Sequence, residues 1–249
     1  MNDLLAQFFD LNQFSQAPLA GEYNNWLVAL SYIVAFIASF AALTIFARAL
    51  GQRNGLRRKG WQLATAFVAG IGVWSMHFIG MLAFELPVVM KHGVALTLLS
   101  ILPAIAGNYA AYSLQLQIKR LAERKRLSAL HEKSLIVASG SLLGAGIGLM
   151  HYIGMAAMQL PAELRYDIGW FTTSIVVAVV LGIIAMATYR NYQVPTRQGG
   201  HSNRLQLSTA LIIAAAISGM HYVAMIAARF YPTSAAELIT GSGHDQHQW

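Results

Sequence analysis

The sequence of 249 residues contains no cysteine. This absence excludes disulfides, iron–sulfur clusters, thiolate metal sites and cysteine nucleophiles. Charge is also scarce, because Asp, Glu, Lys and Arg make up 11% of the residues, against about 25% in soluble domains. The first 14 residues, MNDLLAQFFDLNQF, hold two acids and no basic residue, so a cleavable signal peptide is not expected. These deficits indicate an integral membrane protein.

Hydrophobic residues are abundant instead, at 56% of the sequence. They gather in six apolar runs, each long enough to cross a hydrocarbon core, which takes about 20 helical residues. We predict helices over residues 24–48, 61–85, 91–117, 133–159, 168–190 and 205–229. Transmembrane strands are not expected, because the runs do not alternate as barrel strands do and backbone in lipid has to be hydrogen-bonded within its own segment.

The loops between the predicted helices divide sharply by charge. The first, third and fifth loops hold 14 of the 17 lysines and arginines, whereas the opposite side holds eight of the ten acids. By the positive-inside rule the basic loops are cytoplasmic and both ends of the sequence lie outside. We expect an outer N-terminal segment at 1–23, a six-helix bundle at 24–229 and an outer tail at 230–249. The tail is too polar to cross back, so any further chain would begin with a seventh helix.

Three similar phrases stand near the ends of the second, fourth and sixth predicted helices: MHFIGM at 76–81, GLMHYIGM at 148–155 and MHYVAM at 220–225. Each has a methionine, a histidine, an aromatic residue and, four residues after the histidine, a second methionine. These candidate metal ligands are Met76, His77, Met81, Met150, His151, Met155, Met220, His221 and Met225. The histidines are spaced by 74 and 70 residues, which is one helical hairpin. The predicted fold is an all-α membrane protein of six transmembrane helices in three hairpin repeats, with approximate threefold symmetry.

Helix geometry places each histidine and the methionine four residues later on one face, about one turn apart. Small residues lie beside this face, and small residues at helical spacing let helices approach closely in lipid. The glycines expected at helix contacts are Gly72, Gly80, Gly140, Gly144, Gly146, Gly148, Gly154 and Gly219. The motif face should therefore point into the bundle, with all three histidines at similar depth near the outer surface.

The chemistry of these side chains favours a soft metal. Imidazole and thioether are neutral, soft to borderline ligands that select copper, above all Cu(I), over magnesium and calcium, which prefer oxygen. Zinc is less favoured, since thioether is a poor zinc ligand and no cysteine is present. An ionisable group within a membrane helix is costly and marks a functional site, so three at one depth predict a copper site. No catalytic residue is expected.

The repeated phrase resembles the motif of the MHYT domain, a bacterial integral-membrane sensor module, over essentially the whole chain. The fourth letter differs, because Ile79, Ile153 and Val223 replace threonine, and Phe78 replaces tyrosine in the first copy. The resemblance implies a sensory input domain of the bacterial cytoplasmic membrane. Such a domain would bind copper through the Met-His pair of each copy and detect O2, CO or NO, or copper or redox state. It also implies seven helices and fused GGDEF and EAL domains, which make and degrade cyclic di-GMP.

The expected partners are the lipid bilayer, a diatomic gas, C-terminal GGDEF and EAL output domains and a second copy in a homodimer; nucleic acid is not expected. Three other interpretations stay open. A haem protein would use His/Met or His/His axial pairs, and a metal or proton transporter would use the His/Met rings as a relay. In the third interpretation the motif only stabilises the bundle. The sequence has no haem-attachment motif and no matching polar ring toward the cytoplasm, which favours the sensor.

Overall fold

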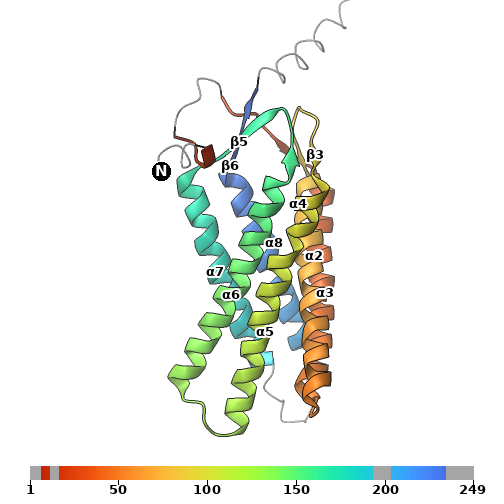
Figure 1. Cartoon of the computed structure of the whole chain (residues 1–249), viewed down its shortest axis with the longest axis vertical. Helices are drawn as coiled ribbons and strands as arrows, with labels where there is room; N and C mark the ends of the chain where they lie inside the picture. The colour runs from red at the N-terminus through yellow and green to blue at the C-terminus, as the bar shows by residue number, and fades with distance from the viewer. Residues whose placement is uncertain (1–6, 12–16, 193–202, 234–249) are drawn as a thin grey trace, which may run out of the picture.

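The computed structural model describes residues 7–11, 17–192 and 203–233. It shows an upright bundle of long helices with short strands gathered at one end (Figure 1). The helices are α2 (Asn25–Gly51), α3 (Gly55–Leu82), α4 (Val94–Leu99), α5 (Ile101–Glu123), α6 (Ala129–Ala156), α7 (Ile168–Tyr192) and α8 (Asn203–Ala227). Among the described residues, six spans are long and apolar enough to cross a membrane, with α4 and α5 forming one of them. The predicted all-helical membrane fold is confirmed.

The six spans form a closed ring in the order α2, α3, α5, α6, α7 and α8, with α8 returning to α2. The second helix of each hairpin is α3, α6 or α8, and these three also contact one another. At least half of the membrane-length window of each is buried inside the protein (50–61%), against 22–28% for the other three spans. Three helices therefore lie innermost and three face outward, as the hairpin repeat predicts.

Two of the helices begin nearer the basic loops than hydropathy predicts. Helix α3 begins at Gly55 and α6 at Ala129, six and four residues before the predicted starts. Polar caps explain these early starts. The Asn54 side chain accepts two backbone N–H groups from the first turn of α3, and the Ser128 side chain accepts one from the first turn of α6. Hydropathy misses these turns because they are polar and extend beyond the apolar run.

The third span contains a break that the sequence analysis does not predict. The short helix α4 ends at Leu99, whereas α5 begins at Ile101 and continues to Glu123, six residues past the predicted end. Pro103 accounts for the break, because it has no N–H to donate and its ring crowds the carbonyl of Leu99, four positions earlier. Both pieces still belong to one apolar span of 30 residues.

Three two-stranded antiparallel sheets close one end of the bundle, called the strand end below. Strand β1 (Glu22–Tyr23) pairs with β2 (Phe84–Glu85), β3 (Lys91–His92) with β4 (Met158–Gln159), and β5 (Ala162–Tyr166) with β6 (Ala228–Pro232). Each sheet joins the start of one hairpin to its end, so the repeat extends beyond the helices. Residues 230–232 of the predicted outer tail belong to β6; residues 234–249 lie outside the described part.

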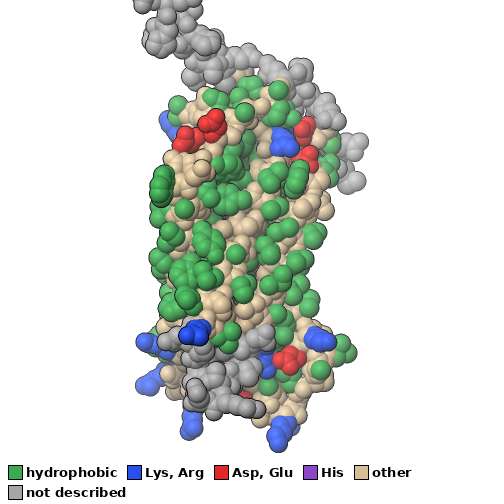
Figure 2. Space-filling view, turned by 180° about the vertical axis from the view of Figure 1, so that it is seen from behind, with side chains coloured by type: hydrophobic (Ala, Val, Ile, Leu, Met, Phe, Trp, Pro, Cys, Tyr) green, Lys and Arg blue, Asp and Glu red, His purple; other side chains and the backbone are tan. Residues whose placement is uncertain are grey.

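The surface of the bundle is divided into bands. Figure 2 shows hydrophobic side chains over the middle of the face, with Lys and Arg gathered at the end opposite the strands. That end, called the basic end below, includes the turn from α5 to α6. Large apolar side chains such as Ile37, Leu149 and Val180 are exposed in the middle band, where a bilayer covers them. The chain is a multi-pass membrane protein.

Candidate metal centre

His77, His151 and His221 meet between the three inner helices, near the strand end. They stand on α3, α6 and α8, and each side chain is at most 1% exposed. Their Nδ1 atoms form a triangle with sides of 3.1 Å (His77–His221), 3.2 Å (His77–His151) and 3.3 Å (His151–His221). Within the described part of the chain, these histidines form a group whose nitrogens lie close enough together to hold a metal ion. The repeat thus brings its three histidines to one point.

Hydrogen bonds among the rings cannot account for this arrangement. An imidazole nitrogen carries either one proton or one lone pair in the ring plane. Three mutually adjacent Nδ1 atoms therefore include at least one repulsive pair, either two protons or two lone pairs. A cation removes the conflict, because it accepts all three lone pairs. The point equidistant from the three nitrogens lies about 1.85 Å from each, close to metal–imidazole bond lengths of roughly 2.0 Å.

The Nε2 atoms on the far sides of the rings explain how the rings are held. All three are buried and have no hydrogen-bond partner among the described residues. A methyl group added at Gly154 would lie 2.4 Å from Nε2 of His77, and one added at Gly80 would lie 2.4 Å from Nε2 of His221. The glycine three positions after one motif histidine thus packs against the ring of another motif histidine. This packing turns Nδ1, rather than Nε2, toward the common centre.

The six motif methionines lie on two sides of the histidines. The methionine before each histidine belongs to the main bundle core, and the one four residues after it belongs to a second apolar cluster beneath the strands. They are Met76, Met150 and Met220 on the core side and Met81, Met155 and Met225 on the strand side. All six are at most 4% exposed. The thioethers therefore enclose the histidines in apolar layers, and a role for them as ligands stays a prediction.

Several of the predicted contact glycines lie where helix backbones approach closely. A methyl group at these positions would come within 2.1–2.8 Å of a neighbouring helix: Gly72, Gly140, Gly144 and Gly146. Gly219 is looser, since a methyl group there would make an ordinary contact of 3.5 Å with Leu181. Gly148 is buried, but a methyl group there would meet no atom within 4 Å. Helical spacing alone does not show which glycine of a series faces a neighbour.

The aromatic residue after each motif histidine reaches the next hairpin. The Tyr152 hydroxyl hydrogen-bonds to Ser174 Oγ on α7 at 2.5 Å, and the Tyr222 hydroxyl to Ser31 Oγ on α2 at 2.9 Å. Phe78 has no hydroxyl, so the first copy lacks this bond. The sequence analysis did not identify the serines, although aligning the odd helices on the same repeat would have found them. The tyrosines couple neighbouring hairpins next to the histidine cluster.

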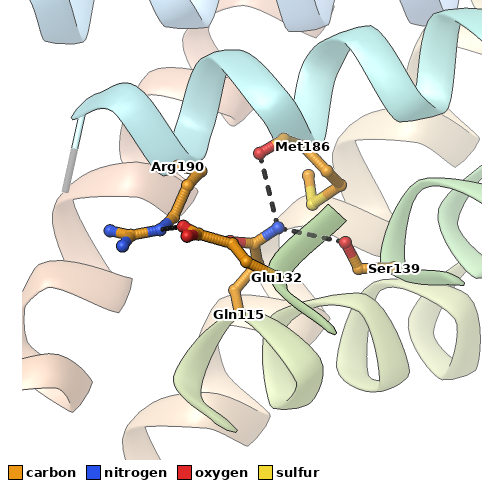
Figure 3. A network of polar contacts seen from close by, with 5 residues as sticks. All are labelled: Gln115, Glu132, Ser139, Met186 and Arg190. Atoms are coloured by element: carbon orange, nitrogen blue, oxygen red, sulfur yellow. Dashed lines mark hydrogen bonds and ion pairs between the residues drawn. The ribbon is translucent and has the colours of Figure 1, made fainter. Parts of the chain in front are cut away.

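A second buried polar group lies toward the basic end. The Gln115 amide nitrogen on α5 donates to Ser139 Oγ on α6 at 3.0 Å and to the Met186 carbonyl oxygen on α7 at 3.3 Å (Figure 3). Nearby, Arg190 on α7 pairs with Glu132 on α6, with Nε and Oε1 2.6 Å apart. This network is not predictable from the sequence, because its members share no motif. The Gln115 amide bridges all three helices and the ion pair links two of them, so the network is suited to holding α5, α6 and α7 together.

The sequence profile of the MHYT family, described as a bacterial signalling protein N-terminal repeat, matches residues 15–58, 70–129 and 144–200. Two of these segments contain a histidine motif. The third motif, at 220–225, lies beyond the last matched segment. Its histidine nevertheless completes the same cluster, so the structure brings the histidines of all three copies together.

Longer bacterial signalling proteins resemble this chain over most of its length. It is 39% identical over 216 residues to the bifunctional diguanylate cyclase/cyclic di-GMP phosphodiesterase MucR of Pseudomonas aeruginosa, which covers 85% of this chain and 29% of MucR. It is 33% identical over 208 residues to the cyclic di-GMP phosphodiesterase NbdA of the same organism, over 82% of this chain and 24% of NbdA. The chain thus spans less than a third of the length of these relatives, and no solved structure matches it. The chain belongs to the MHYT family, the N-terminal repeats of bacterial signalling proteins.

Proposed function

We propose that this domain is a copper-binding sensory input module of a cyclic di-GMP signalling protein. One observation carries the proposal: three buried histidines from three repeats direct their Nδ1 atoms to one point, 3.1–3.3 Å apart. The names of two relatives state cyclic di-GMP synthesis or hydrolysis. Because the aligned region is less than a third of each, we assign catalysis to other parts of such a protein and sensing to this one.

Charge is the main reason to prefer copper. The three imidazoles are neutral ligands between apolar layers, and the cost of moving an ion into such surroundings rises with the square of its charge. A monovalent ion such as Cu(I) is therefore easier to accommodate than divalent zinc. The motif methionines favour Cu(I) further, as additional ligands or as a soft lining. Three histidines also occur in catalytic zinc sites, so the identity of the metal is the first quantity to measure.

The position of the site suggests how a signal arises. Copper bound here would supply redox activity and affinity for O2, CO or NO. The chain supplies three neutral nitrogens, excludes water and links the site to α3, α6 and α8. A change in occupancy or oxidation state therefore alters the spacing of the three inner helices, and we propose that this change reaches C-terminal GGDEF or EAL domains. The stimulus is a diatomic gas or the copper or redox state itself.

Orientation follows from the charge of the two ends. The basic end faces the cytoplasm by the positive-inside rule, which places the strand end and the histidine cluster toward the outer face of the bacterial cytoplasmic membrane. A homodimer of such domains would align two sets of output domains. In this arrangement the stimulus arrives from outside, and the output domains respond to it in the cytoplasm.

Two alternative functions fit the geometry less well. Axial ligands on opposite faces of a haem iron need about 4 Å between nitrogens, twice a metal–imidazole bond, whereas the Nδ1 atoms here are 3.1–3.3 Å apart. A transporter needs a passage toward the basic end. The cavity beside Asn108 and Tyr112 on that side has a volume of about 10 Å³, which is room for about one water molecule.

Metal analysis of the purified protein tests the proposal. We expect stoichiometric copper in the wild type and none in a variant with His77, His151 and His221 all changed to alanine. A Gln115→Leu variant, altered only in the other polar network, should retain the copper. Full copper in the triple variant would reject the proposed site. Zinc in place of copper would reject the proposed metal, and a Soret band in the optical spectrum would favour haem.

A further inference from the structure

The three hairpins differ where their strands meet. In each sheet the last residue of the strand before the hairpin pairs with a residue just after the motif helix. The pairs are Tyr23 with Phe84, His92 with Met158, and Tyr166 with Ala228. Directly paired residues in an antiparallel sheet lie on the same face, with Cβ atoms about 4.5–5.5 Å apart. One sheet of the three therefore sets an imidazole beside a thioether.

Phe78 lies between His92 and the nearest histidine of the cluster. The ring of His92 is 5.5 Å from the ring of Phe78, which in turn is 4.8 Å from the ring of His77. The corresponding ring pairs at the other two junctions are Tyr166–Tyr152 and Tyr23–Tyr222, at 5.3 and 5.7 Å. At those junctions the motif tyrosine is also hydrogen-bonded to a serine of the next hairpin. The junction of Phe78 and His92 has no such hydrogen bond. Its two hairpins are therefore held together less firmly than those at the other two junctions.

His92 and Met158 offer two potential metal ligands side by side. Nε2 of His92 is buried and has no hydrogen-bond partner among the described residues. Met158, unlike His92, lines a partly open cavity of about 330 Å³ at the strand end, together with Tyr152 and Met155. Met155 is the motif methionine four residues after the cluster histidine.

We infer that His92 and Met158 form an entry site that takes up Cu(I) from the outer side and transfers it to the three-histidine cluster. The inference rests on the proposed function, in which that cluster binds copper. One imidazole and one thioether are both neutral and soft, a combination that favours Cu(I) over the hard cations of the medium. The ion changes ligands without any change in its oxidation state, and no proton has to move.

An entry site answers an energetic difficulty of the cluster. The histidines are at most 1% exposed and lie beneath an apolar layer, so an ion that gave up all its water in one step would face a high barrier. His92 and Met158 replace part of the hydration shell at the partly exposed strand end. Met155, which lines the same cavity, offers the next soft ligand toward the cluster. The barrier is thereby divided into smaller steps, so the site affects the rate of loading and not the final affinity.

Loading kinetics of the metal-free protein in detergent test this inference. Cu(I) is supplied as its bicinchoninate complex, whose visible absorbance falls as the protein takes the ion. The variants are His92→Tyr, which installs the residue found at the other two junctions, and Met158→Leu, which keeps the volume but removes the sulfur. Tyr23→Phe at the equivalent position of another junction is the matched control. We expect each entry-site variant to load at least about tenfold more slowly, a barrier increase of about 1.4 kcal/mol, with equilibrium affinity and the control unchanged.

The possible results separate this inference from the function on which it rests. Slower loading at unchanged affinity supports the entry site. Loading at the wild-type rate in the His92→Tyr, Met158→Leu double variant overturns it, while copper in the cluster leaves the proposed function intact. A fall in affinity that accounts for the slower loading also overturns it, because His92 would then support the cluster itself. A wild-type protein that takes up no Cu(I) rejects the proposed function, and the entry site with it.

Discussion

The strand end and the basic end of the bundle both bury polar side chains among three helices, but they satisfy them differently. At the strand end, three histidines bring their Nδ1 atoms within 3.1–3.3 Å, and their Nε2 atoms have no partner among the described residues. At the basic end, the Gln115 amide nitrogen reaches two acceptors. Buried polar groups are normally hydrogen-bonded, and an exception calls for an explanation. The strand end thus offers nitrogens that could hold a metal ion, whereas the basic end holds a hydrogen-bonded network between helices.

The two ends also differ in how closely they keep the threefold repeat. The motif histidines are identical in all three copies. The residues 23 positions after Tyr23, His92 and Tyr166 are Phe46, Gln115 and Tyr189. All three are buried, and the rings of Phe46 and Tyr189 are 5.5 Å apart. Equivalent positions toward the basic end therefore differ between the copies, whereas the motif histidines near the strand end are the same in all three.

The largest effect on stability is expected from Gly140→Ala, in the basic half of α6. A methyl group there would lie 2.3 Å from the Cα of Ile183, so α6 and α7 would have to separate. We expect a loss of about 3 kcal/mol in the free energy of unfolding, the upper part of the range for overpacking. Denaturation in detergent, followed by tryptophan fluorescence, measures it. Gly148→Ala is the matched control on the same helix, and an equal loss there would contradict the contact argument.

The next effect concerns metal rather than stability, and comes from Gly154→Ala at the strand end of the same helix. The methyl group would lie 2.4 Å from Nε2 of His77, so the ring has to turn away from the common centre. We expect copper affinity to fall about 10- to 100-fold, as for other changes to residues that orient metal ligands. Competition with a copper chelator measures the affinity. Equal copper affinity in Gly154→Ala and Gly148→Ala would show that the contact between Gly154 and His77 does not set the orientation of the His77 ring.

The smallest of the three effects is expected from Gln115→Leu at the basic end. It removes two hydrogen bonds, to Ser139 and to the Met186 carbonyl, and interhelical hydrogen bonds in membrane proteins contribute about 0.6 kcal/mol each. We expect a loss of about 1 kcal/mol in unfolding free energy and unchanged copper affinity. The same denaturation and chelator assays measure both. A large loss of copper would show that the two ends are coupled, and the contrast between them would fail.

Much of the fold was predictable because it depends on local properties. Apolar length predicted all six spans, and the register of three motifs predicted that the inner helices would bring their histidines together. The break before Ile101 was missed because hydropathy does not register the crowding that Pro103 imposes. The strands were missed because each is only two to five residues long and is made by pairing with a segment far away in the sequence. Gly148 is buried but packs less closely than Gly140 and Gly144, because an α-helix turns 100° per residue and a row of glycines slants across its face.

The amino-acid sequence by itself determined that this chain spans a membrane, that it is built of three hairpins and that each hairpin carries one histidine at the same depth. Those properties follow from composition, periodicity and repetition, which need no knowledge of neighbours. Only the tertiary structure decided that Nδ1 is the converging nitrogen, because Gly80 and Gly154 of adjacent helices set the ring orientation. It also decided that His92 faces Met158, since strand register is fixed by pairing across the fold. A helix forms from local sequence, whereas the distance between two helices depends on how the whole chain packs.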